Sequence, residues 1–346
     1  MSRPYAGSME ADPNIMNSGS DTSARFAAFA AAAEEGGSPL YAAWAAALAA
    51  DPDLLAIVDR ARPSQRQPVL VLAVCRLLGA PLSPVDGLGG WIRGHADVLV
   101  AELDRRFTQT NDVRRVAPVA VALSRIPGSV ALLEVGASAG LGLYPDRYDI
   151  RVTEPSTNDA TPPRVLGSRD SRVRIDLRVE SGDLLEPAAA LPEIVWRRGL
   201  DIEPLDVRDD DDMLWLATLL WPGQDDRVEL LCGAVAVARQ DPAPVVRGDA
   251  VDGLVALADS APLEATLVVV SSGTLVYLPG ARRQAFVDAV GSLGARWISY
   301  ERTGLLTGIQ ATLPDPEGSR PLFATLALDG VALASGDAHG TVLRAF

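Results

Sequence analysis

The 346-residue chain contains no lysine, and all 31 of its basic residues are arginines. It therefore offers neither a Schiff-base lysine nor the lysine of a Walker-type phosphate loop. Cysteine is also scarce, with only Cys75 and Cys232, which lie far apart in apolar helical patterns. We expect two buried free thiols and no metal site, because zinc-like ligand spacing is absent.

The sequence also lacks a long apolar run and an excess of positive charge. No apolar stretch reaches the roughly 18 residues of a membrane-spanning helix, and no secretory signal pattern is present. The formal net charge of −14 disfavours nucleic acid and anionic membrane surfaces as partners. We expect a cytoplasmic protein that binds a small molecule and, at most, a second copy of itself in a homodimer.

The composition, 48% hydrophobic and 22% charged, is that of a folded protein, and its length favours about two domains. Residues 1–20 lack periodicity and are expected to form a disordered tail. Residues 21–127 are typical of successive helices, with Asp21, Ser38 and Asp51 placed as N-caps. We interpret this region as a helical N-terminal lid domain.

The pattern changes after Gly128, where short apolar runs begin to alternate with helical patterns. This alternation predicts an α/β domain over 128–346, with a doubly wound, mostly parallel sheet of Rossmann type. The predicted strands are VALLEVG, EIVWRRGLD, APVVRGD, ATLVVVSSG and RWISYE. Asp329-Gly330 predicts a C-terminal antiparallel hairpin. Residues 151–190 are interpreted as an irregular, polar insertion between the first two strands.

The segment LLEVGASAGL places small residues directly after the first predicted strand, where we expect a turn and then a helix. Gly136, Ala137, Ser138 and Gly140 fit two chemistries. In the G-x-S-x-G elbow of a serine hydrolase, the serine is an exposed nucleophile. In a nucleotide-binding fold, small residues let a ligand approach the backbone.

The hydrolase alternative requires a sheet upstream of the elbow and a histidine base. The preceding hundred residues are helical in pattern. The chain order Ser…Asp…His can be met formally by Ser138, Asp249 and His339, and the base must be either His95 or His339. The motifs that follow the later strands favour the nucleoside-cofactor alternative instead.

Acidic residues follow the second and third predicted strands. Asp201, followed by Ile202, ends the second strand, where a carboxylate can accept hydrogen bonds from ribose hydroxyls. Gly248, Asp249 and Ala250 follow the third strand, and the aspartate can accept from an exocyclic amine of adenine. Both acids belong to the predicted ligand-binding edge.

Two further polar features complete the predicted cofactor site. Glu134 lies in the first strand, where an acid suits an ammonium group, and Ser271 and Ser272 end the fourth strand. This order of motifs resembles class I S-adenosylmethionine-dependent methyltransferases. The resemblance implies S-adenosylmethionine as cofactor and methyl transfer, and the acidic net charge favours a small-molecule acceptor over nucleic acid. The cofactor already carries an activated methyl group, so the protein mainly has to align the acceptor.

The chain is also similar, nearly end to end, to a large bacterial family known only as a domain of unknown function. The similarity rests on RF…FA…SPLY, TQTN, LLEVGASAGL, GLD…P.DV, WP, RGDA and a near-terminal HG. The chain departs from the family pattern at Gly142, at Ser271 and at the terminal DAHG. If these positions contact substrate, this member has its own acceptor or a different reaction.

A general base is needed only if the acceptor carries a proton at working pH, and the candidates are His339, Glu301 and Tyr144. The candidate substrate-binding residues lie in the polar TQTND segment, near the glycine turn or just before the second-strand acid: Gln109, Asn111, Arg147, Tyr148 and Arg197. The alternatives are a helix cap for the TQTND segment and solvated surface positions for the others, and surface solvation is the favoured explanation for Arg197. A non-methylating cyclase or decarboxylase on the same fold, and a binding or regulatory module, remain alternatives.

Overall fold

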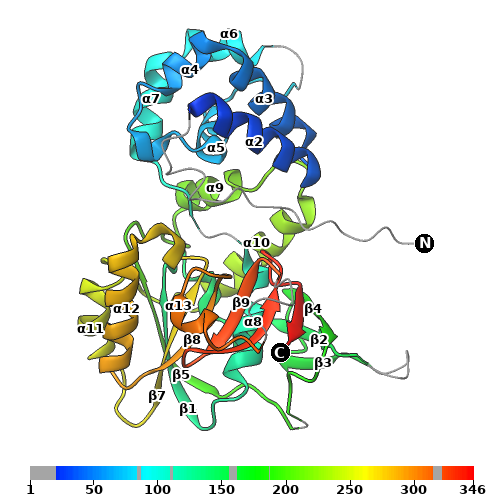
Figure 1. Ribbon diagram of the computed structural model, residues 1–346, viewed down its shortest axis with the longest axis vertical. Coiled ribbons are helices and arrows are strands. Elements are labelled where there is room, and N and C mark those ends of the chain that lie inside the picture. Colours follow the sequence, from blue (N-terminus) through cyan, green and yellow to red (C-terminus); the bar gives the residue numbers. More distant parts are fainter. Residues whose placement is uncertain (1–20, 84–86, 110–111, 156–161, 187, 315–321) are drawn as a thin grey trace. The chain divides into compact units, whose positions relative to one another are not determined.

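The computed structural model describes residues 21–83, 87–109, 112–155, 162–186, 188–314 and 322–346 (Figure 1). The predicted tail, 1–20, lies outside them. The chain divides into two compact units. The helical unit comprises Met1–Asn111 and Asp210–Glu229, and the sheet unit comprises Asp112–Asp209 and Leu230–Phe346. Residues 112–127 therefore fold with the sheet, which differs from the domain boundary expected at residue 127.

The helical unit contains one 3₁₀ helix and seven complete α-helices in its described part. These are α2 (Thr22–Glu35), α3 (Pro39–Ala50), α4 (Pro52–Val58), η1 (Pro63–Gln65), α5 (Pro68–Leu77), α6 (Leu88–Gly94), α7 (Ala96–Arg105) and α9 (Asp210–Thr218). Asp21 and Asp51 cap α2 and α4 by accepting backbone N–H bonds, as predicted. Ser38 precedes α3 but makes no side-chain cap bond, and Pro39 follows it at the first helical position, where the fixed φ of proline favours the helix.

Aromatic side chains form the core of the helical unit. Phe29 packs edge-on against Trp221 with ring centroids 5.1 Å apart, and Tyr41 and Trp44 are buried beside them. No single described helix is long and apolar enough to cross a membrane. The pair α3 and α4 would reach that length only together, and the two helices are bent by 101°.

The sheet unit is mixed α/β and contains one large, mostly parallel sheet. Eleven strands are found among the described residues: β1 (Ser129–Val135), β2 (Asp149–Thr153), β3 (Arg164–Gly167), β4 (Arg174–Ser181), β5 (Glu193–Asp201), β6 (Val245–Arg247), β7 (Thr266–Ser272), β8 (Arg296–Arg302), β9 (Ala324–Leu328), β10 (Val331–Gly336) and β11 (Val342–Ala345). Their order is β3-β2-β4-β11-β10-β9-β8-β7-β1-β5-β6. The five strands predicted from apolar runs are β1, β5, β6, β7 and β8.

The direction of winding reverses beside β1. After β2, β3 and β4, which lie at the far end of the sheet, the chain forms β5 and β6 on one side of β1 and then returns to β7 and β8 on its other side. The strands β1, β5, β6, β7 and β8 are parallel to one another. The carboxyl ends of β1, β5 and β7 therefore meet at one edge. In doubly wound sheets ligands bind at such a switch point.

Residues 151–190 are not an irregular insertion. They include β3, β4 and most of β2, and β4 pairs with β11, so this segment extends the same sheet. In β4 the buried residues Ile175, Leu177 and Val179 alternate with exposed polar ones, which is the pattern of a strand with one solvated face.

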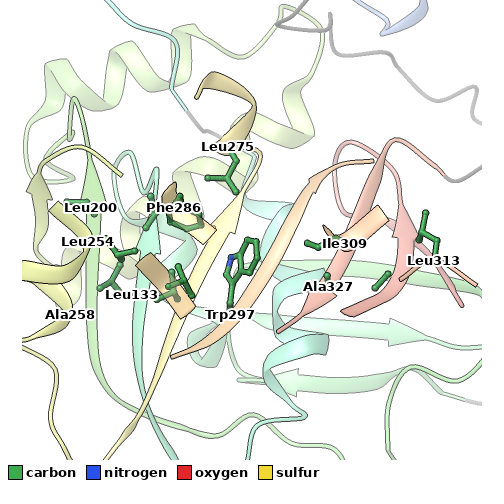
Figure 2. Close-up of a cluster of buried hydrophobic side chains, with 14 residues drawn as sticks. Leu133, Leu200, Leu254, Ala258, Leu275, Phe286, Trp297, Ile309, Leu313 and Ala327 are labelled. Atoms are coloured by element: carbon green, nitrogen blue, oxygen red, sulfur yellow. The ribbon is translucent and has the colours of Figure 1, made fainter. Parts of the chain in front are cut away.

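Helices cover both faces of the sheet. They are α8 (Val116–Leu123), α10 (Asp225–Gln240), which begins in the helical unit, α11 (Asp252–Ala258), α12 (Gly280–Ser292) and α13 (Thr307–Gln310). Figure 2 shows the core between the strands and α11, α12 and α13, where Leu133, Leu200, Phe286 and Trp297 are buried. Burying each such side chain stabilises the fold by about 1.5–3 kcal/mol.

The C-terminal hairpin and one of the two thiols follow the predictions. Asp329 and Gly330 have positive φ and join β9 to β10 in an antiparallel pair. Cys75 is buried, and burial raises the pKa of its thiol to about 12. The expectation of a second buried thiol is wrong, because Cys232 lies on the exposed side of α10.

Candidate functional site

The loop after β1 forms a tight turn with three residues at positive φ: Gly136 (75°), Ser138 (54°) and Gly140 (72°). The backbone N–H groups of Gly136 and Ala137 both donate to the carbonyl of Leu200 in β5. The predicted helix after this turn is wrong, since two 3₁₀ turns follow, η3 (Leu141–Leu143) and η4 (Pro145–Arg147). The proline and the left-handed Gly140 prevent a continuous α-helix.

Ser138 is held by an acid from the neighbouring strand. Its backbone N–H donates to Asp201 Oδ2 at 2.7 Å. Its side chain is buried, and Oγ has no hydrogen-bond partner in the structure. Positive φ is strained for a serine, as in a nucleophile elbow, but the nucleophile of an elbow is exposed and Ser138 is only 1% exposed.

Both oxygens of Asp201 bind backbone N–H groups. Oδ2 accepts from Ser138, and Oδ1 accepts from Glu203 at 2.8 Å. The carboxylate therefore joins the glycine turn to the loop after β5. Each carboxylate oxygen can accept more than one hydrogen bond, so this clamp still leaves acceptor capacity for a ligand. The neighbouring Ile202 is exposed and donates no side-chain polar group.

The glycines of the turn are surrounded by the protein's own atoms. A Cβ on Gly136 would overlap the side chain of Thr274, and a Cβ on Gly142 would lie 2.6 Å from Glu134 Oε2. A Cβ on Gly199 would lie 2.6 Å from the Ala137 methyl. Close packing within the fold is therefore one reason for these small residues, beside the ligand approach that the sequence suggested.

Glu134 is a buried carboxylic acid at the switch point. It is 8% exposed, and its Oε2 has no hydrogen-bond partner. Burial raises the pKa of this carboxyl to about 8, while Arg115 lowers it and Asp201 raises it. The acid is therefore largely protonated at neutral pH until a cation approaches it.

Arg115 places a guanidinium at this edge, and sequence reasoning missed it. It ends η2 (Val113–Arg115), its Nη1 donates to the Ser272 carbonyl at 3.4 Å, and its buried Nε has no partner. Its guanidinium lies where a side chain on Gly273 would be. The only sequence signal was an Arg-Arg pair just before an apolar helix, which is common on protein surfaces.

His339 is paired with Asp112. The imidazole Nδ1 lies 2.6 Å from Asp112 Oδ2, and the same carboxylate accepts two bonds from the Arg114 guanidinium. A carboxylate can only accept here, so Nδ1 carries the proton and Nε2 is the basic nitrogen of the neutral ring. The loop is fixed beside η2, because a Cβ on Gly340 would lie 3.0 Å from Arg115 Cα.

Asp249 has a local structural role. Its Oδ1 accepts the backbone N–H groups of Val251 and Asp252 at the start of α11, and it pairs with Arg282. Gly248 N–H donates to the Asp201 carbonyl, and Ala250 is half-buried beside the core. The predicted triad is not assembled, since His339 binds Asp112 while Asp249 binds Arg282.

The two serines that end β7 point to opposite faces of the sheet. Ser271 Oγ accepts from Trp297 Nε1 at 3.3 Å in the core. Ser272 Oγ is buried without a partner. The backbone carbonyl of the same residue accepts the hydrogen bond from Arg115. Glu301, at the end of β8, accepts backbone N–H bonds from Thr274 and Leu275 on Oε1, the latter in η5 (Leu275–Tyr277).

Burial raises the pKa of Glu301 to about 7, and the N–H groups of Leu275 and Thr274 lower it, as do Arg115 and the Ser271 hydroxyl. Its second oxygen, Oε2, has no partner. Side chains alternate between the two faces along β8, so Glu301 lies on the same face as Trp297, which is the core face of the sheet. Tyr300 lies on the other face and donates to the Asp337 carbonyl.

Four residues that were predicted for catalysis or substrate binding are hydrogen-bonded or ion-paired to other residues of the protein. The Tyr144 hydroxyl donates to the Asp241 carbonyl and accepts from the Ala243 N–H, and Tyr148 donates to the Leu141 carbonyl. Arg147 pairs with Asp241.

The fourth is Arg197, which forms a two-point ion pair with Asp146. These contacts hold η3 and η4 in place, and this structural role is enough to account for the four residues. Gln109 lies half-buried in the helical unit. Asn111 falls outside the described residues.

A model of the family described as "Uncharacterized protein conserved in bacteria (DUF2332)" matches residues 23–82 and 83–344. The chain therefore belongs to this family. No curated protein and no solved structure matches it.

Proposed function

We propose that this member of the family is an S-adenosylmethionine-dependent methyltransferase that acts on a small-molecule acceptor. The observation that carries the proposal is a set of four buried polar atoms without a hydrogen-bond partner: Arg115 Nε, Glu134 Oε2, Ser138 Oγ and Ser272 Oγ. They lie around the carboxyl ends of β1 and β7, where a doubly wound sheet binds its ligand. Unpaired buried polar groups are costly, so a polar ligand here would stabilise them.

The charges at this edge suit a zwitterion. Glu134 offers a carboxylate to an ammonium group, and Arg115 offers a guanidinium to a carboxylate. S-Adenosylmethionine carries both groups on its amino-acid end and supplies an activated methyl group. Asp201, one strand over, has acceptor capacity left for ribose hydroxyls beyond the two N–H bonds that it already accepts.

Among the three candidate bases, His339 is favoured. Asp112 fixes its tautomer, so that Nε2 can take a proton from a weakly acidic acceptor. The Tyr144 hydroxyl already donates and accepts within the fold, and Glu301 lies on the core face. An acceptor that loses a proton on methylation, such as a hydroxyl, thiol or ammonium compound, is the class that such a base serves.

Calorimetric titration with S-adenosylmethionine and S-adenosylhomocysteine tests the proposal. We expect binding of both ligands, weakened at least tenfold by Arg115→Gln and by Asp201→Asn, since each loses a charge-assisted contact. Asp288→Asn, which removes an exposed carboxylate on α12, is the matched control and should bind normally.

The outcome also separates the alternatives. Binding without methyl transfer to any acceptor in a screen would favour a non-methylating enzyme or a regulatory module. Labelling of Ser138 by a fluorophosphonate, with no binding of either adenosyl compound, would replace the proposal with a serine hydrolase.

A further inference from the structure

A second polar site lies on the core face of the sheet, opposite to Arg115 and Glu134. A small cavity is bordered by Ser299 and Glu301 of β8, Thr325 of β9 and Gln310 of α13. Glu301 and Thr325 are direct partners across the strands, so their side chains share this face. The cavity has room for one atom the size of a water molecule.

Three buried oxygens at this cavity have no hydrogen-bond partner: Ser299 Oγ, Glu301 Oε2 and Gln310 Oε1. Ser299 and Glu301 are only 1% and 2% exposed. A buried carboxylate oxygen without a partner is among the costliest groups in a protein interior. The three oxygens border one small space, so one bound species can contact all of them.

The oxygens that border the cavity are mostly hydrogen-bond acceptors. The Thr303 hydroxyl donates to the Leu322 carbonyl, so it must accept the proton of Thr325 in the bond between these two hydroxyls. Thr325 Oγ1 has therefore already used its proton and can only accept further hydrogen bonds, as Glu301 Oε2 and Gln310 Oε1 do. A water molecule has two protons and leaves the third acceptor to the Ser299 hydroxyl, whereas a cation can bind all of these oxygens at once.

We propose that this cavity binds one monovalent cation of about the size of potassium, held by Glu301, Ser299, Gln310 and Thr325. Oxygen-only ligands exclude the softer transition metals. A single carboxylate balances a single positive charge, and no group of three His, Cys, Asp or Glu side chains is found among the described residues. Arg302 also borders the cavity, but its side chain leaves β8 on the opposite face from Glu301.

The cation site is connected to the edge that carries the glycine turn, although it does not depend on the proposed function. Glu301 Oε1 accepts the N–H of Thr274, and the Thr274 side chain fills the space beside Gly136. A cation that fixes the Glu301 carboxylate would therefore also hold the loop after β7 in place.

Thermal unfolding of the full-length protein in potassium chloride and in tetramethylammonium chloride at equal ionic strength tests the site. The large organic cation cannot enter the cavity. We expect a midpoint that is higher in potassium and saturates with its concentration, because a ligand that binds only the folded state stabilises it. Ser299→Ala should need about tenfold more potassium for the same shift, Glu301→Gln should lose the response, and Asp288→Asn should retain it.

A crystal of the wild-type protein soaked in thallium, a heavy substitute for potassium, gives an independent measurement. The site predicts an anomalous peak within the cavity. Equal midpoints in the two salts, or a thallium-soaked crystal with only a water molecule between Ser299 and Gln310, would overturn the proposal.

Discussion

The Asp201 carboxylate accepts the backbone N–H of Ser138 at 2.7 Å and so connects the end of β5 to the turn after β1. Its other oxygen holds the N–H of Glu203. One side chain therefore sets the shape of the two loops that border the switch point. Any ligand contact of Asp201 has to be made in addition to this clamp.

Replacing Asp201 by asparagine should destabilise the protein as well as weaken ligand binding. The amide keeps one acceptor oxygen and turns an NH₂ group toward an N–H, which leaves one backbone donor unpaired. We expect a loss of about 1–3 kcal/mol in the free energy of unfolding. Urea denaturation measures it, and an unchanged midpoint would mean that the clamp is not formed in solution.

A methyl group at Gly142 should disturb the buried acid. The added Cβ would lie 2.6 Å from Glu134 Oε2, so Gly142→Ala should cost about 1–3 kcal/mol by overpacking. Gly291→Ala is the matched control, since a Cβ there meets nothing within 4 Å and alanine favours a helix by up to about 1 kcal/mol. Equal stability of the two variants would argue against the described packing at Glu134.

The pKa of Glu134, raised by burial to about 8, predicts the pH dependence of stability. The folded protein keeps this proton up to about pH 8, whereas the unfolded chain releases it near its ordinary value. The folded state binds more protons in between, so the free energy of unfolding falls as pH rises from about 4.5 to 8. Arg115, Asp201 and Tyr148 are the charged or titratable groups coupled to this carboxyl.

Glu134→Gln lacks this titration. Its stability relative to wild type should increase by up to about 4 kcal/mol between pH 5 and pH 8. Urea midpoints for both proteins at pH 5, 6.5 and 8 check this difference. Parallel curves would show that Glu134 is ionised throughout the range.

His339 should be locked in one tautomer by Asp112. The chain has only one other histidine, His95, so the ring nitrogen resonances of ¹⁵N-histidine-labelled protein are easy to assign. We expect the neutral His339 ring to carry its proton on Nδ1, with Asp112→Ala abolishing this preference. A ring protonated on Nε2 would remove His339 as a base of the proposed kind.

The two thiols should react very differently with a thiol reagent. Cys232 is exposed, whereas Cys75 is buried and the pKa of its thiol is about 12. The thiolate is the reactive form, so we expect one fast-reacting thiol in the folded protein and two after unfolding. Rapid modification of both thiols in the native state would contradict the packing of α5.

Sequence patterns predicted the strands that contain continuous apolar runs and missed β4, in which apolar and polar residues alternate. Runs such as ATLVVVSSG stand out because helices cover both sides of them. In β4, Ile175, Leu177 and Val179 alternate with arginines and acids, and the alternation was present but was interpreted as a polar insertion. The pairing of β4 with β11 joins residues more than 160 positions apart, which local patterns do not specify.

The sequence predicted which residues lie at the carboxyl edge of the sheet better than it predicted which partners they bind. Glu134, Ser138 and Asp201 do meet at one edge, because parallel strands end together. Arg115 could not be foreseen, since its role depends on how η2 docks on the ends of β7 and β8. Asp249 and Arg197 looked like ligand-binding residues because sequence does not reveal that Arg282 and Asp146 bind them.

The most direct test of the account is a crystal structure of the protein with S-adenosylhomocysteine. We predict the ligand at the carboxyl ends of β1, β5 and β7, with its ammonium group near Glu134, its carboxylate near Arg115 and its ribose within hydrogen-bond distance of Asp201. Crystals soaked at saturating concentration that show this edge closed, with Arg115 and Glu134 in the same positions and no ligand between them, would contradict it.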